Sequence, residues 1–341
     1  MEFDSRAILV GFLGAAAVLG ILVWFVGVGE IQRVLTMLSP VTLVLIVAVG
    51  VVWLAAWGLA LCRVLDALGI RASAWDGFLL YASAAFANNI TPFGQAGGEP
   101  FSALLISRAT DSEYESGLVA IASLDTLNFV PSILFALVGL SYYVARFAVG
   151  DSVLLVLGIV VLLAVGIPVL AYLGWQNRHA VEDRLAGVVH PVWSAAGRHL
   201  PGIGVPKREG VVRRIDGFFR AIERVATSRR NLAVALAYST FGWLCMCVAL
   251  YLSLWALTPA VDINAAVVFI AVPVASIASI TPLPGGTGGV EAALVLLIVP
   301  ITGVSAVTAT SAALVFRGAT YWFPILLGGG ATAWLEARAG R

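Results

Sequence analysis

The chain has 341 residues, of which 60% are hydrophobic and 11% are charged, and its formal net charge is +1. Soluble globular domains carry about a quarter of charged residues, so this composition excludes a soluble enzyme and predicts an all-α protein of the lipid bilayer. The three cysteines, Cys62, Cys245 and Cys247, fall in or beside apolar stretches and lack a partner pair. We therefore expect no metal site and no cofactor.

Six apolar runs are long enough to cross the hydrocarbon core of a membrane, which takes about 20 helical residues. In chain order they are 8–28, 41–61, 117–144, 153–175, 232–257 and 304–327. The first run is too long, and lacks the small-residue cleavage pattern, to be a signal peptide, so we interpret it as a spanning helix. The protein is thus predicted to be a multi-pass protein of the cell membrane.

A long polar stretch, 176–230, is rich in arginine and sets the predicted orientation. By the positive-inside rule it is cytoplasmic, as are both termini. Within it, residues 211–225 have an apolar face and an arginine-rich face. This helix either lies on an anionic leaflet or packs on the cytoplasmic ends of the spans. Membrane spans flank the stretch directly and its aromatic residues sit on the apolar face, so nucleic acid is not expected as a partner.

Two further apolar segments are interrupted by similar sequences. Residues 91–100 read TPFGQAGGEP, and residues 281–291 read TPLPGGTGGVE. Both breaks contain Thr-Pro, then glycines, then a glutamate, which indicates an internal repeat. The apolar arms around each break are too short for two full crossings, so we predict two re-entrant helical hairpins, which are tolerated in a membrane when protein or a wet cavity surrounds them.

Counting crossings from a cytoplasmic N-terminus, the first hairpin enters from the cytoplasm and the second from outside. Each half of the chain, 1–150 and 151–341, then holds three spans and one hairpin, and the odd number of spans inverts the second half. The predicted architecture is a single transmembrane domain built as an inverted repeat, with the binding site where the two hairpin tips meet.

The tips have the chemistry of an anion site. A helix begins after each break, so unpaired N–H groups and the positive end of the helix dipole face the centre of the membrane. Glycines would let these N–H groups reach phosphate oxygens, although glycines also serve tight turns and close helix packing. The candidate binding residues at the tips are Asn89, Pro92, Gln95, Gly97, Gly98, Pro284, Gly285, Gly286, Gly288 and Gly289.

Each break is followed by a glutamate, Glu99 in the first and Glu291 in the second. A charge at the centre of a bilayer costs at least about 2.5 to 3.5 kcal/mol on insertion scales, so such a residue normally has a partner or a function. Both glutamates are candidate ligands for the substrate, a proton or a cation. The alternative is that they cap the helices that follow the breaks.

Other ionisable residues lie within the spans. Asp125 has Asn128 three residues later on the same helical face. Arg317 lies inside the last span, where its guanidinium could hold a phosphate with two hydrogen bonds. An ion pair of Arg317 with Glu291 or Asp125 is the structural alternative. Arg108, nearer the interface, is a further candidate ligand, or it simply extends toward the headgroups.

These motifs resemble a known family. Residues 91–100 with Arg108 downstream, and the sequence PGGTGGVE followed by RGATYWFP at 317–324, are similar to the lysylphosphatidylglycerol synthase transmembrane, or flippase-like, family. This family includes the membrane half of the bacterial multiple peptide resistance factor. The resemblance covers nearly the whole chain and implies transbilayer movement of a phospholipid or lipid-linked sugar. The aminoacyl-transferase domain of the two-domain members is absent, so lipid synthesis is not implied.

The sequence therefore predicts a flippase or scramblase for an anionic phospholipid or a polyprenyl-phosphate-linked sugar, and not an enzyme. A secondary transporter of a small soluble anion and an intramembrane lipid-modifying enzyme are the alternatives. Residues 285–289 lack the Lys-Ser/Thr ending of a phosphate loop, so movement is expected to be passive or ion-coupled. A membrane lipid is the expected partner; a separate lipid-modifying enzyme or glycosyltransferase and a homo-oligomer are left open.

Overall fold

The computed structural model describes residues 38–91, 94–146, 208–259 and 263–339, with isolated positions between 29 and 36 and between 158 and 176. Every regular element in these ranges is a helix. The predicted spans 8–28 and 153–175, the tip residue Pro92, and the boundary between the two halves at 150 lie outside the described residues or on isolated positions.

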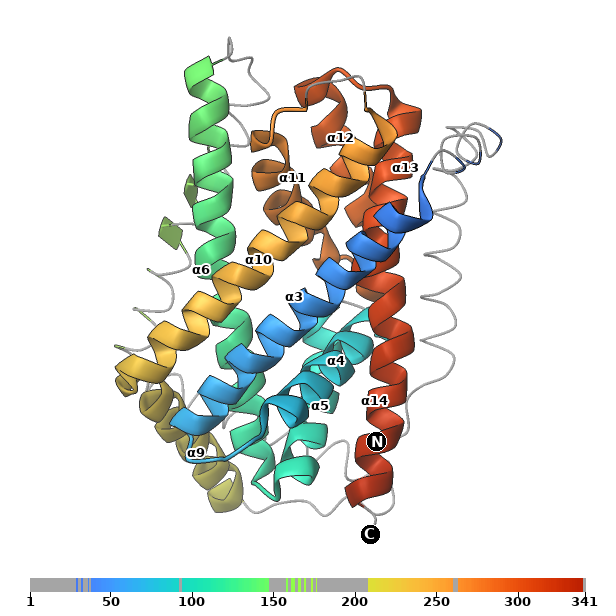
Figure 1. Cartoon of the computed structure of the whole chain (residues 1–341). Helices are drawn as coiled ribbons and strands as arrows, with labels where there is room; N and C mark the ends of the chain where they lie inside the picture. The colour runs from blue at the N-terminus through green and yellow to red at the C-terminus, as the bar shows by residue number, and fades with distance from the viewer. Residues whose placement is uncertain are drawn as a thin grey trace.

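Three long helices cross the whole molecule (Figure 1). They are α3 (Pro40–Ala67), α6 (Tyr114–Arg146) and α10 (Arg229–Leu257), and they confirm the predicted spans 41–61, 117–144 and 232–257. By length and composition each can cross a membrane, as can Pro284–Thr302, which the sequence assigned to the second hairpin. The described part of the chain thus holds four candidate spans, as expected of a multi-pass membrane protein.

Helix starts follow from local capping residues. Ser39 precedes Pro40, the first residue of α3, and its hydroxyl accepts a hydrogen bond from the N–H of Thr42 at 3.1 Å. At the start of α4 (Ala74–Ile90), Ser73 and Asp76 form a reciprocal capping box. The hydrogen bond from the Ser73 hydroxyl is the main cause of a lowered pKa at Asp76.

The two predicted breaks are present as interruptions between helices. The first separates α4 from α5 (Gln95–Thr110), and the second lies between α11 (Ala266–Ile277), with its 3-10 extension η1 (Ala278–Ile280), and α12 (Gly289–Thr302). A further 3-10 turn, η2 (Pro284–Gly286), lies inside the second break. In Figure 1 the α4–α5 pair reaches inward from one end of the molecule and the α11–α12 pair from the other.

The predicted span 304–327 differs from the structure. It consists of α13 (Ala306–Arg317), a π-helical segment η3 (Gly318–Trp322) and α14 (Phe323–Ala339), and it continues well past the expected end. Short π-helical segments are often found at functional sites. Here η3 lies at the level of the two breaks, and a hydropathy window cannot detect it because its residues remain apolar.

Helix α9 (Arg208–Thr227) includes the predicted amphipathic stretch. Its Ala221 and Val225 are buried, and Phe218 and Ile222 pack against the same hydrophobic core. Figure 1 shows α9 at the end of the molecule where α10 begins. Of the two arrangements expected for this helix, the structure shows packing against the ends of the spans. Contact of its arginine face with an anionic leaflet stays a prediction.

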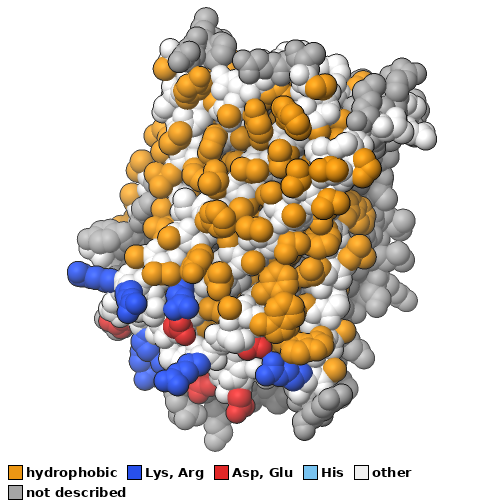
Figure 2. All heavy atoms as spheres, viewed as in Figure 1, with side chains coloured by type: hydrophobic (Ala, Val, Ile, Leu, Met, Phe, Trp, Pro, Cys, Tyr) orange, Lys and Arg blue, Asp and Glu red, His pale blue; other side chains and the backbone are white. Residues whose placement is uncertain are grey.

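The outer surface has a broad apolar belt. Figure 2 shows hydrophobic side chains covering most of this face and charged side chains gathered at one end. Leu134, Leu296 and Leu326 are 54%, 74% and 77% exposed, respectively. A soluble protein does not expose apolar patches of this extent, so lipid is the expected environment of this belt.

Close helix contacts in the bundle depend on small residues. An ideal Cβ built on Gly328 of α14 would lie 2.1 Å from the carbonyl oxygen of Ala82 on α4. Gly58 of α3 and Gly77 of α4 approach each other in the same way, since a Cβ on Gly77 would lie 2.6 Å from the oxygen of Gly58. Membrane helices gain packing contacts when small residues let their backbones approach.

Two glycines of α14 provide a matched test of this packing. Gly328→Ala should force α14 away from α4 and destabilise the protein by about 1 to 3 kcal/mol, the usual cost of overpacking. Gly330→Ala adds the same methyl group where no atom lies within 4 Å, so it should be neutral or stabilise the helix by up to about 1 kcal/mol. The midpoints of thermal unfolding in detergent measure both; equal midpoints would show that the α4–α14 contact is not tight.

Candidate functional site

The two breaks contact each other through the π-helical segment. The hydroxyl of Tyr321 lies 3.3 Å from the carbonyl oxygen of Asn89 in the first half and 3.4 Å from that of Pro284 in the second. The side-chain amide of Asn89 donates to the backbone oxygen of Tyr321 at 3.3 Å. An ideal Cβ on Gly94 would lie 2.8 Å from the oxygen of Ser279, so the breaks also touch directly.

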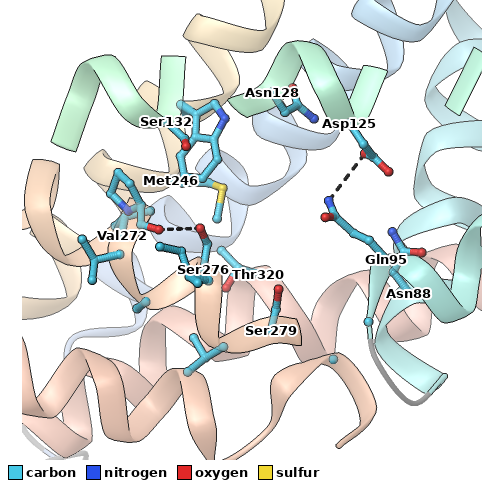
Figure 3. A pocket seen from close by; sticks show the side chains of 18 of the residues that line it. Asn88, Gln95, Asp125, Asn128, Ser132, Met246, Val272, Ser276, Ser279 and Thr320 are labelled. Carbon is cyan, nitrogen blue, oxygen red and sulfur yellow. Dashed lines mark hydrogen bonds between the residues drawn. The ribbon is translucent and has the colours of Figure 1, made fainter. Parts of the chain in front are cut away.

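A cavity of about 350 Å³ lies beside the breaks. Figure 3 shows polar side chains from several elements facing it, with the Gln95 amide of α5 reaching the Asp125 carboxylate of α6. Asp125, Asn128 and Ser132 recur at intervals of three and four residues, which places them on one face of α6. Thr320 of η3 and Ser279 of η1 also line the cavity. A cavity of this size suits a small ligand or a headgroup.

Several polar atoms around the cavity have no hydrogen-bond partner. Among the described residues, nine buried side-chain nitrogen or oxygen atoms lack one, and five of them belong to residues that line the cavity. These five are Trp53 Nε1, Asn88 Oδ1, Asp125 Oδ2, Asn128 Nδ2 and Trp243 Nε1. A buried unsatisfied polar group costs about 1 to 3 kcal/mol, so their concentration here indicates a polar occupant, either water or a ligand.

Aromatic side chains form one wall of the cavity. Trp53, Trp57, Tyr81 and Trp243 all line it, and the ring of Trp57 lies 5.4 to 5.8 Å from the other three. The Trp57 N–H is bound to the backbone oxygen of Ser239 at 3.1 Å. The wall is therefore rigid, and it presents the Trp53 and Trp243 N–H groups as free donors.

Arg317 and Glu291 form a buried ion pair. Arg317 Nε donates to Glu291 Oε1 at 2.8 Å, and Arg317 Nη2 donates to the backbone oxygen of Gly285 at 3.0 Å. The other carboxylate oxygen of Glu291 accepts the Gly288 N–H at 2.6 Å, which caps α12. The guanidinium also lies 4.2 Å from the ring centroid of Tyr321. The structure thus contains the Arg317–Glu291 ion pair that the sequence analysis gave as the alternative to a phosphate-binding role. Arg317 nevertheless lines the cavity.

Most tip glycines contribute to the shape of the breaks. The N–H groups of Gly97 and Gly98 are bound to the oxygen of Gly94, and that of Gly286 to the oxygen of Leu283. A Cβ on Gly98 would lie 2.6 Å from the backbone nitrogen of Asn88, so this glycine allows α4 and α5 to pack. These contacts support the turn-and-packing alternative, and they do not support a phosphate held by these three N–H groups.

The structure places the sequence-predicted residues in four ways. Asn89, Gln95, Asp125, Asn128, Gly285 and Arg317 line the cavity, and Glu99 lines a second hollow, of about 300 Å³, that shares Gln95 and Asp125 with it. Arg108 is exposed in the last turn of α5 and is not brought to the site. The remaining described candidates shape the breaks without lining either hollow: Gly97, Gly98, Pro284, Gly286, Gly288, Gly289 and Glu291.

Sequence reasoning missed the aromatic wall and several polar lining residues, namely Trp53, Trp57, Tyr81, Asn88, Ser132, Trp243, Ser276, Ser279 and Thr320. Tryptophans inside spans α3 and α10, away from the membrane interface where this residue concentrates, were the available signal for the wall. For Asn88 the available signal was its position beside Asn89 at the break. A second polar side chain in an apolar stretch needs a hydrogen-bond partner.

These features define a membrane protein, helical throughout its described elements, with a mostly apolar cavity that holds a few buried polar groups where two helix breaks meet. The chain belongs to the family described as the lysylphosphatidylglycerol synthase TM region, whose model matches residues 8–328. It is similar to a protein named UPF0104 membrane protein of the archaeon Methanothermobacter thermautotrophicus. The two are 24% identical over 332 residues, which cover 95% of this chain and 92% of that protein.

The ion pair predicts a specific pattern of stability. Arg317→Gln leaves Glu291 as a buried, unpaired charge, which should destabilise the protein by about 3 to 5 kcal/mol. The double variant Arg317→Gln with Glu291→Gln should regain most of this loss because neither charge remains. Arg338→Gln, which breaks the exposed pair with Asp76, is the control and should cost about 1 kcal/mol or less. Thermal unfolding in detergent checks all three, and a double variant no more stable than Arg317→Gln would contradict the pairing.

Proposed function

We propose that this protein moves an anionic phospholipid or a polyprenyl-phosphate-linked sugar across the bilayer, as a flippase or scramblase, without altering it chemically. The polar headgroup occupies the central cavity while the acyl or isoprenoid tails remain in the membrane. Membership of a family described by a lipid synthase's membrane region supports a lipid-related role. The central cavity supports transbilayer movement of the lipid as the particular activity.

The observation that carries the proposal is a mostly apolar cavity in which a few buried polar atoms lack a partner, with exposed apolar side chains at its rim. Five unpartnered polar atoms belong to its lining. At its edge, Phe129 of α6, Ile277 of α11 and Ile280 of η1 also line it, and these three side chains are 42%, 39% and 65% exposed. This rim belongs to the apolar belt. A lipid matches both parts, because its headgroup suits the interior and its tails suit the rim.

The unpartnered donors suit phosphate oxygens. They are Trp53 Nε1, Trp243 Nε1 and Asn128 Nδ2, and Ser239 fixes the amide of Asn128 by donating to its Oδ1 at 2.5 Å. The start of α5 adds to them, since its N-cap Gly94 provides no side-chain cap and Gly94 and Gln95 both line the cavity. Asn88 Oδ1 is an acceptor, which suits a hydroxyl group of the headgroup.

We further propose that the α4–α5 and α11–α12 pairs are re-entrant hairpins related by an inverted repeat. The positively charged end of the molecule would face the cytoplasm. In Figure 1 the first pair starts and finishes at the end where Figure 2 shows the charged side chains, and the second pair starts and finishes at the opposite end. The two breaks would then meet near the midplane, the usual position of a transporter site.

Reconstituted protein tests the proposed activity. Liposomes containing the purified protein should exchange fluorescent phosphatidylglycerol between leaflets faster than protein-free liposomes, and the lipid should be recovered unchanged by mass spectrometry. Ala136→Phe should abolish the exchange, because Ala136 lines the cavity and is 3% exposed, so its ring would fill the space for the headgroup. Leu326→Phe adds the same ring on the lipid-facing surface and should leave exchange intact.

The outcomes separate the alternatives. Uptake of inorganic phosphate by the same liposomes, without lipid exchange, would favour a transporter of a small soluble anion. A chemically altered lipid would favour an enzyme. If the Ala136→Phe variant exchanges lipid at the wild-type rate, the headgroup does not pass through this cavity.

The proposed orientation makes a prediction about accessibility. In a variant whose buried cysteines Cys62, Cys245 and Cys247 have been replaced, a cysteine at exposed Glu113, between α5 and α6, should react only with a reagent added from the cytoplasm. A cysteine at exposed Ala306, at the start of α13, should react only from outside. Labelling of both positions from one side would contradict the hairpins, because each pair of arms must return to the side from which it entered.

A further inference from the structure

Two carboxyl groups meet beside the cavity. Glu99 of α5 and Asp125 of α6 line the same small hollow, close enough for a hydrogen bond between their carboxyl groups once one of them is protonated. Asp125 is 7% exposed and Glu99 is half-buried. Gln95 Nε2 donates to Asp125 Oδ1 at 3.5 Å, and no N–H donor of the described residues reaches the buried Asp125 Oδ2. When the cavity holds neither water nor a ligand at this second oxygen, a proton shared with Glu99 would satisfy it.

Elementary chemistry fixes the minimum number of protons in this pair. An ionised carboxylate only accepts hydrogen bonds, so a hydrogen bond between two carboxyl groups requires a proton on one of them. Two carboxylates in contact away from bulk water repel each other strongly, and such pairs retain a proton. The pair therefore carries at most one negative charge at rest.

In the part of the chain that the structure describes, no cation is paired with either carboxyl group. Tyr81 of α4 lines the central cavity together with Asp125, and Tyr114 at the start of α6 is near enough to Glu99 to sense its charge. Both are uncharged phenols. Arg317, the buried guanidinium of the described residues, is bound to Glu291. No ion pair to Glu99 or Asp125 is found among the described residues. The other charged residues with described side chains on α5, α6 and the elements packed against them are Arg63, Asp66, Asp76, Arg108, Glu115, Arg220, Glu223, Arg224, Arg229, Arg230, Glu336 and Arg338.

The position of the pair links it to the proposed ligand site. Asp125 lines both the central cavity and the smaller hollow, whereas Glu99 lines only the smaller one. Asp125 is thus the member that a headgroup in the cavity would meet, and half-exposed Glu99 is the member through which a proton enters or leaves. Gln95 lies between the two hollows and holds the Asp125 carboxyl group in place.

We propose that Glu99 and Asp125 form a proton-binding site that takes up one further proton when an anionic headgroup enters the cavity and releases it when the headgroup leaves. The added proton neutralises the pair, and the protonated Asp125 donates its O–H to a phosphate oxygen. This inference rests on the proposed function and adds energy coupling to it. Proton and lipid move in the same direction, one proton for each headgroup.

Infrared spectroscopy of the purified protein tests the pair without any transport assay. The C=O band of a protonated carboxylic acid should be present at neutral pH and absent in Asp125→Asn, because half-exposed Glu99 then has no carboxyl neighbour and ionises. Glu99→Gln should shift the band by removing the hydrogen-bond partner of Asp125. Glu113→Gln, at an exposed glutamate outside both hollows, should leave it unchanged. A wild-type protein without the band, or a band unaffected by both pair variants, overturns the shared proton.

Liposomes with an imposed pH gradient test the coupling. One unit of gradient corresponds to about 1.4 kcal/mol per proton, so fluorescent phosphatidylglycerol should accumulate about tenfold in the leaflet facing the more alkaline side. The Glu99→Gln variant should show the same distribution with and without the gradient. Wild-type exchange that ignores the gradient overturns the coupling. If the wild-type protein exchanges no lipid at all, the proposed function is refuted. The infrared measurement then still tests whether Glu99 and Asp125 share a proton.

Discussion

The bonds that Arg317 makes hold the centre of the molecule together. A chain that interrupts its helices inside a membrane must satisfy the freed backbone groups within the protein, because lipid cannot do so. Glu291 meets this requirement for the Gly288 N–H and Arg317 for the Gly285 carbonyl, while the two side chains neutralise each other. Since Arg317 belongs to α13, these bonds fix the second break against the last helical unit of the bundle.

The π-helical segment after Arg317 extends this constraint to the other half of the chain. Its Tyr321 reaches backbone oxygens of both breaks, and its Thr320 lines the cavity. The cavity therefore lies where two interrupted helices cannot pack as closely as continuous ones would. The polar side chains in its lining follow from the same geometry. The breaks bring Asn88, Asn89 and Ser279 to the level at which α3, α6 and α10 pass.

The sequence was sufficient to predict the membrane class, the three long spans within the described residues and the positions of both breaks. Hydropathy and glycine-proline patterns report these features directly. The aromatic wall could not be predicted, because helices in a bilayer are apolar on all sides and periodicity does not show which face meets another helix. For the tip glycines the sequence left both a ligand and a tight turn open, and the N–H groups of Gly97, Gly98 and Gly286 bond within their own turns. Spacing alone cannot distinguish an open amide from one that closes a turn.

The two glutamates show how a repeated motif can perform different tasks. Glu291 is the third residue of α12, the position from which a carboxylate reaches back to cap the helix. Glu99 is the fifth residue of α5, too far along to cap, so the start of α5 stays open toward the cavity and its glutamate meets Asp125 instead. A shift of two residues between similar breaks thus gives one half a closed scaffold and the other an open helix end beside an acidic pair. The two breaks fix where the halves of the described chain meet, and this difference in register leaves the start of α5, rather than that of α12, without a side-chain cap beside the cavity.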